Sequence, residues 1–87
     1  MATRTSIDEL LTKCEQAIEY AEHEYEQGAM QEHYNSEEFS QVQQLLEQRF
    51  QDLIKMENSS SPQQKEQMYR MRLRLQDIQN DLILLRR

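Results

Sequence analysis

The stretch that decides the fold is residues 61–85, SPQQKEQMYRMRLRLQDIQNDLILL. The first residues of this stretch are typical of a helix N-terminus. Ser61 can cap a helix, Pro62 suits the first helical position and Gln64 can complete a capping box. Apolar residues then recur at alternating intervals of three and four positions, which places about one side chain per turn on a single helix face. These residues are Met68, Met71, Leu75, Ile78, Leu82 and Leu85. The pattern predicts a helix over 62–86 with one apolar seam.

Two segments with the same periodicity precede this helix. The first is expected over 6–33 and opens with Ser6 and Glu9, a second capping box. The next is expected over 36–57, followed by a polar loop at 58–61. The apolar positions expected to face a core are Ile7, Leu10, Leu11, Cys14, Ala17, Ile18, Ala21 and Tyr25 in the first segment, and Phe39, Val42, Leu45, Leu46, Phe50, Leu53, Ile54 and Met56 in the second.

Gly28, the only glycine in the chain, makes two positions possible for the end of the first helix. It lies on the continuation of the apolar stripe. It therefore either ends the helix or permits the close approach of a neighbouring helix.

The chain has 87 residues, which is the size of one domain. One glycine and one proline in that length indicate long uninterrupted elements. Short connections make successive helices antiparallel. We therefore expect an all-α, three-helix, antiparallel up-down-up bundle. The alternative is a helical hairpin whose third helix packs mainly on another subunit, so that self-association completes the fold.

Charge is distributed unevenly along the chain, whose formal net charge is −6. Residues 6–34 hold eight acidic residues and one lysine, whereas residues 59–87 hold three acidic and six basic residues. Opposite charges favour contact between the first and third helices, within one chain or between two chains. The overall acidity disfavours a nucleic-acid partner, because binding to phosphates requires a cationic surface.

Motifs for catalysis, cofactors and metals are absent from the sequence. The residues three before His23 and His33 are Tyr20 and Met30, so the Glu-x-x-His pairs of dinuclear bundles are missing. One glycine cannot form a phosphate-binding loop. We therefore expect no enzyme activity, no cofactor and no metal site, with a metal-binding bundle as the least favoured alternative.

Cys14, the only cysteine, lies on the apolar stripe and is expected in the core. A single cysteine excludes an intrachain disulfide and suits a reducing cytoplasm. The longest apolar run, residues 82–85, is too short for a transmembrane segment. Followed by two arginines, this run could instead contact a membrane surface.

Residues off the seam of the third helix form a candidate interaction surface. Arg72 and Arg74 flank the seam, where they are expected to pair with acids on a neighbouring helix. Binding an acidic protein partner is the alternative for these arginines. Exposed apolar residues often mark association sites, so we expect self-association through this helix. The candidate surface consists of Tyr69, Arg70, Arg72, Leu73, Arg74, Ile83 and Leu84.

The sequence therefore favours a small, non-catalytic protein–protein interaction or regulatory module in the cytoplasm. A structural or stress-related helical protein without a specific client is the alternative.

Four short stretches resemble the YtzC-like proteins, small uncharacterised proteins of Bacillus-type Firmicutes. They are MATRTSIDE at 1–9, QEHYN at 31–35, QMYRMRL at 67–73 and QND at 79–81. The resemblance runs the full length of the chain. It implies a bacterial cytosolic setting and supplies no site residues.

Overall fold

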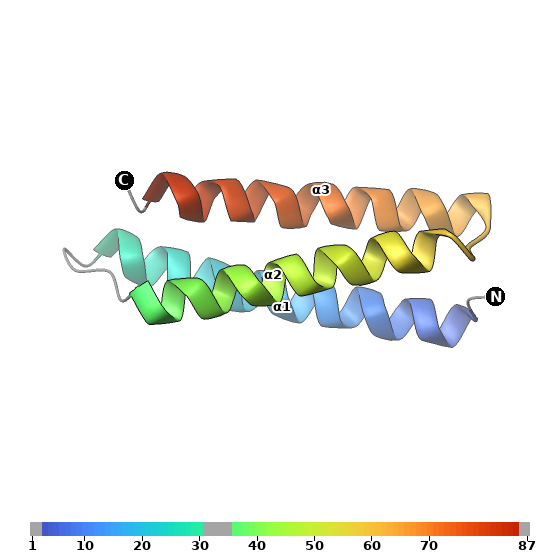
Figure 1. Ribbon diagram of the computed structural model, residues 1–87, viewed down its shortest axis with the longest axis horizontal. Helices are drawn as coiled ribbons and strands as arrows, with labels where there is room; N and C mark the ends of the chain where they lie inside the picture. Colours follow the sequence, from blue (N-terminus) through green and yellow to red (C-terminus); the bar gives the residue numbers. More distant parts are fainter. Residues whose placement is uncertain (1–2, 31–35, 86–87) are drawn as a thin grey trace.

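The computed structural model describes residues 3–30 and 36–85. Within them it has three α-helices and no strand: α1 (Arg4–Met30), α2 (Ser36–Glu57) and α3 (Pro62–Leu85). Figure 1 shows α1 and α3 running in one direction and α2 in the other. Each helix packs against both others, and the molecule measures 46 × 17 × 15 Å. The predicted all-α, up-down-up, three-helix bundle is confirmed.

The start of α3 is the one that the sequence predicts. The backbone N–H of Ser61 donates to Gln64 Oε1 (2.9 Å), and the backbone N–H of Gln64 donates to Ser61 Oγ (3.3 Å). These two bonds form a reciprocal capping box, with Pro62 in the first helical position. Two backbone donors that the helix itself leaves unpaired are thereby satisfied.

The start of α1 differs from the prediction. The helix begins at Arg4 rather than Ser6, and Thr3 is the capping residue. The backbone N–H of Ser6 donates to Thr3 Oγ1 (3.0 Å), and that of Ile7 donates to the carbonyl of Thr3 (3.1 Å). Threonine caps helices almost as well as serine, so the earlier cap adds two residues to the helix. The expected box between Ser6 and Glu9 is therefore wrong.

Gly28 does not end α1, because the helix continues to Met30. A glycine near a helix end costs about 1 kcal/mol relative to alanine, which neighbouring helix formers tolerate. Residues 31–33, which the prediction included in this helix, lie outside the described residues, as does residue 86 at the end of α3. The helix expected over 36–57 has those bounds in the structure.

The core runs along the axis of the bundle. No polar or charged side chain of the described residues is buried. The seam residues of α3 from Met68 to Leu82 are buried, as predicted, and the side chain of Leu85 lies outside the described part of the structure. The buried side chains are Ile7, Leu10, Cys14, Ala17, Ile18, Ala21, Val42, Leu46, Leu53, Met68, Met71, Leu75, Ile78 and Leu82.

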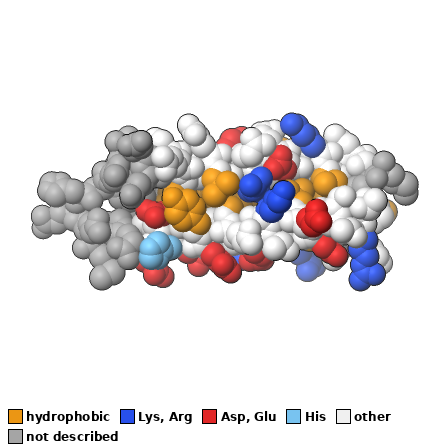
Figure 2. All heavy atoms as spheres, turned by 90° about the horizontal axis from the view of Figure 1, so that it is seen from below, with side chains coloured by type: hydrophobic (Ala, Val, Ile, Leu, Met, Phe, Trp, Pro, Cys, Tyr) orange, Lys and Arg blue, Asp and Glu red, His pale blue; other side chains and the backbone are white. Residues whose placement is uncertain are grey.

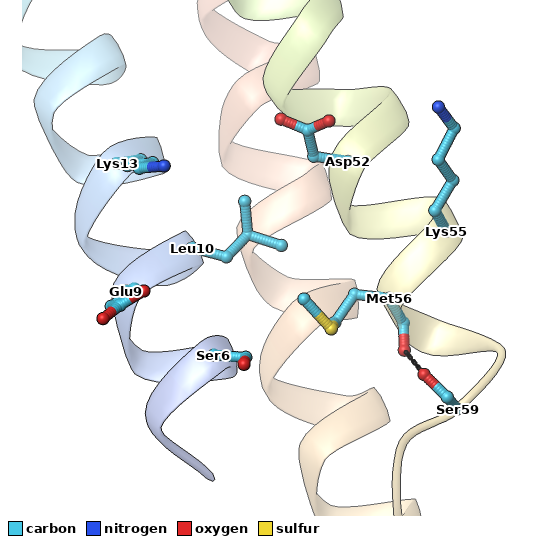
Figure 3. Close-up of a pocket in the computed structure, with 8 residues that line it drawn as sticks. All are labelled: Ser6, Glu9, Leu10, Lys13, Asp52, Lys55, Met56 and Ser59. Carbon is cyan, nitrogen blue, oxygen red and sulfur yellow. Dashed lines mark hydrogen bonds between the residues drawn. The ribbon is translucent and has the colours of Figure 1, made fainter. Parts of the chain in front are cut away.

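The stripe of α1 lies slightly to one side of its expected position. Leu10 is buried, whereas Leu11 is only partly buried and Tyr25 is exposed. A helix in a three-helix bundle must cover two neighbours, so its apolar face is wider than a single row. Leu10 belongs to the side that faces α2, where its side chain points toward Met56 (Figure 3).

Candidate interaction surface on the third helix

Four apolar residues lie on the side of α3 turned away from its buried seam. Tyr69 and Leu73 are one helical turn apart, and Ile83 and Leu84 follow three turns later. Their exposed fractions are 51%, 42%, 50% and 60%. We call these four residues the outer face of α3. All four belong to the predicted interaction surface, and the structure leaves them open to solvent.

Arg74 connects α3 to α1. Its guanidinium donates two hydrogen bonds to the Glu15 carboxylate, one to Oε1 and one of 3.0 Å to Oε2. This bond from Arg74 lowers the pKa of Glu15 and raises the pKa of Arg74 itself. The pairing predicted between the acidic first helix and the basic third helix is therefore present within one chain.

Arg72 connects α3 to α2. Its Nε lies 2.9 Å from Glu57 Oε1, an ion pair that lacks the alignment of a hydrogen bond. The same guanidinium lies over the rings of Tyr69 (5.5 Å to the centroid) and Phe50 (5.9 Å). Such cation–π contacts stabilise the cation. The guanidinium of Arg72 therefore has its partners within the same chain.

Arg70 forms an ion pair within its own helix. It pairs with Glu66 at 2.8 Å, and both side chains are largely exposed. The structure therefore separates the three arginines of the predicted surface. Arg72 turns to α2, Arg74 turns to α1, and Arg70 remains available to a partner.

Cys14 is fully buried, as the apolar stripe predicts. Burial raises the pKa of its thiol to about 11, and Asp52 and Glu15 act in the same direction against the opposing effect of Arg49. A neutral thiol without access to solvent is a poor nucleophile. Cys14 is a packing residue in this bundle.

Of the two histidines, the structure describes only His23. His23 is exposed, and His33 lies outside the described residues. Within residues 3–30 and 36–85, no cluster of three or more His, Cys, Asp or Glu side chains could hold a metal ion. Over the same residues, no helix has the length and apolar character needed to cross a membrane.

The sequence did not predict the shallow groove between the start of α1 and the end of α2. Leu10 and Met56 form its apolar floor, and charged side chains such as Lys13 and Asp52 stand around it (Figure 3). A polar serine lies at each end of its lining, Ser6 on α1 and Ser59 after α2. Such a groove depends on how two helices are aligned, which neither helix reveals alone.

The face opposite α3 has a mixed character. Figure 2 shows apolar side chains there in a narrow row, interrupted by basic and acidic side chains, with further acidic groups along one edge. Mixed charge keeps apolar groups from forming a continuous patch. The outer face of α3 is therefore the stronger candidate for association.

Comparisons with known proteins agree with the resemblance noted from the sequence. Residues 1–84 match the family described as "Protein of unknown function (DUF2524)". The chain is 51% identical over 84 residues to the "Uncharacterized protein YtzC" of Bacillus subtilis (strain 168), covering 97% of this chain and 93% of that protein. No solved structure matches. The likeness to the YtzC-like proteins is confirmed.

Proposed function

The chain belongs to the DUF2524 family of proteins of unknown function, and we propose that it is a small, non-catalytic protein–protein interaction module that self-associates through α3. The observation that carries this proposal is the exposure of four large apolar side chains on the outer face of α3. The same surface supports a regulatory role, because a second copy bound to the outer face of α3 would block other partners from that face.

The bundle does not need these four side chains for its own core. The seam of α3 already packs against both other helices through Met68, Leu75 and Leu82, which are completely buried. Burying an apolar side chain contributes about 1.5–3 kcal/mol, so leaving four exposed forgoes a large stabilisation. A second molecule that covers them recovers part of it.

The cytoplasm is the location that we propose. The only cysteine of the chain is a buried free thiol, which needs no oxidising compartment.

The proposal is tested by measuring the mass of the purified protein across a wide range of concentration by sedimentation equilibrium. We expect a mass that rises with concentration toward that of a dimer. Leu73→Asp should hold the protein at the monomer mass, because it places a charge in the centre of the contact. Tyr20→Asp is the matched control. Tyr20 is exposed to a similar extent (39%) but lies on α1, so its substitution should leave the association unchanged.

A monomer mass for the unmodified protein at every concentration would contradict self-association. Equal loss of association in Leu73→Asp and Tyr20→Asp would contradict the assignment to α3. Far-UV circular dichroism of each variant checks that the helices remain folded.

A further inference from the structure

The charges along one edge of the outer face of α3 are ordered. The groove between α1 and α3 is lined on its α3 side by Arg74, Asp77 and Asp81, which places these three residues on the edge nearest α1. Arg70 lies one turn before Arg74 and shares that edge. We call these four residues the α1-side edge. It is positive in its first half and negative in its second.

The opposite edge of the outer face has no such order. Arg72 lies there, next to Glu57 of α2. Gln79 lies there too, because its carbonyl accepts from Gln43 of α2 (3.3 Å) and its side chain donates to Glu47 of α2 (3.4 Å). We call Arg72 and Gln79 the α2-side edge. It offers a partner one positive charge and no negative charge of its own.

From this asymmetry we infer that a second copy of the chain docks antiparallel on the outer face of α3, about a two-fold axis near Gln76. The inference rests on the proposed self-association and adds its geometry. A two-fold axis perpendicular to a pair of helices makes the interface self-complementary and brings each edge against the same edge of the second copy. Arg70, whose intrachain partner Glu66 is exposed, then meets Asp81 of the second copy. Arg74 stays bound to Glu15 and lies opposite Asp77 of the second copy.

A parallel pair would have the opposite electrostatics. It brings the α1-side edge of one copy against the α2-side edge of the other, so that Arg70 approaches Arg72 of the second copy. The two aspartates would then face Gln79, which carries no charge. Exposed ion pairs contribute little to affinity, but they decide orientation when the apolar contact is available to both arrangements.

The apolar residues fit the same axis. The midpoint between Arg70 and Asp81 falls between residues 75 and 76, and the midpoint between Tyr69 and Leu84 falls between residues 76 and 77. At 1.5 Å per residue these midpoints lie about 1.5 Å apart along the helix. Both sets of contacts can therefore form together. Tyr69 of each copy then packs near Leu84 of the other. Gln76 of one copy lies beside Gln76 of the other, next to the two-fold axis.

Short bismaleimide crosslinking between introduced cysteines tests this geometry. All variants carry Cys14→Ala, so that each has one thiol. We expect Gln76→Cys to crosslink with itself. Tyr69→Cys should not, because two residues at position 69 lie about 21 Å apart along an antiparallel pair centred on residue 76. An equimolar mixture of Tyr69→Cys and Leu84→Cys should give a crosslinked mixed dimer.

The outcomes separate this inference from the proposed function. Crosslinking of Tyr69→Cys with itself would show a parallel pair and overturn the inference while self-association stands. A dimer mass without crosslinks at any of the three positions would also overturn it. A monomer mass for the unmodified protein would refute the proposed self-association itself.

Charge reversal supplies an independent readout. Arg70→Glu and Asp81→Arg should each weaken dimerisation by about 5- to 30-fold, because each disrupts two symmetry-related pairs. The double variant should regain affinity, since it restores both pairs with the signs exchanged. A double variant weaker than either single variant would overturn the antiparallel arrangement.

Discussion

At the scale of single residues, both burial and nearby charges change the pKa of the Cys14 thiol. Arg49 favours the thiolate, but its side chain is 3.0 Å from Asp52, and that carboxylate disfavours the thiolate. The two effects oppose each other, so desolvation decides the result and raises the pKa to about 11. The sequence predicts the buried position of Cys14 from its place on the stripe. It does not reveal the charged pair beside it, which α2 contributes.

Because of this raised pKa, the stability of the bundle falls as the pH rises through the alkaline range. The thiol has a pKa of 9.0 when unperturbed, so the unfolded chain loses its proton first as the pH rises. The contribution of the neutral thiol is complete below that value and is lost as the pH passes through about 11. We expect the unmodified protein to lose about 2–3 kcal/mol more than Cys14→Ala between about pH 8 and pH 12, since one pKa unit corresponds to about 1.4 kcal/mol.

Urea unfolding followed by circular dichroism at several pH values measures this difference. Tyrosine and lysine titrations affect both proteins alike and cancel in the comparison. A constant difference between the two proteins over this range would contradict the raised pKa.

At the scale of the helices, α1 and α3, whose capping residues are described, show what a capping pattern can predict. For α3 the cap, the proline and the glutamine agree on one start, and the structure has that start. For α1 both Thr3 and Ser6 are good caps, and local sequence alone does not rank them. The earlier cap prevails because Arg4 and Thr5 can extend the helix at little cost.

Serine-to-alanine substitutions at the two predicted caps distinguish these cases. Ser61→Ala removes an acceptor that binds the backbone N–H of Gln64, so it should lower the free energy of unfolding by about 1 kcal/mol. Ser6→Ala should cost clearly less, because Ser6 lies inside α1 and Thr3 supplies the cap. Thermal melts of both variants at one protein concentration provide the measurement. Equal destabilisation would mean that Ser6 has a capping role after all.

At the scale of the whole molecule, the fold follows from apolar spacing, because three amphipathic helices with short connections have few ways to bury their stripes. The exposure of Tyr69 and Leu73 was predictable for a related reason, since both residues lie off the seam and have no place in the core. For the ion pairs between helices, the sequence predicted the type of partner but not the individual residue. Acids were expected opposite Arg72 and Arg74, but choosing Glu57 and Glu15 requires the alignment of the helices along the rod.

The division of α3 into a buried seam and an open outer face predicts opposite results for two leucines two residues apart. Leu75 is completely buried, so Leu75→Asp places an unpaired carboxylate in the core and should unfold the protein or bring its melting temperature close to room temperature. The cost of several kcal/mol is comparable to the whole stability of a domain of this size, about 4–13 kcal/mol. Leu73 is 42% exposed, so Leu73→Asp should keep its helical content and melt near the unmodified monomer. Circular dichroism melts at low concentration separate folding from association. Similar melting temperatures for the two variants would mean that α3 does not present these two faces, and the interaction surface would lose its structural basis.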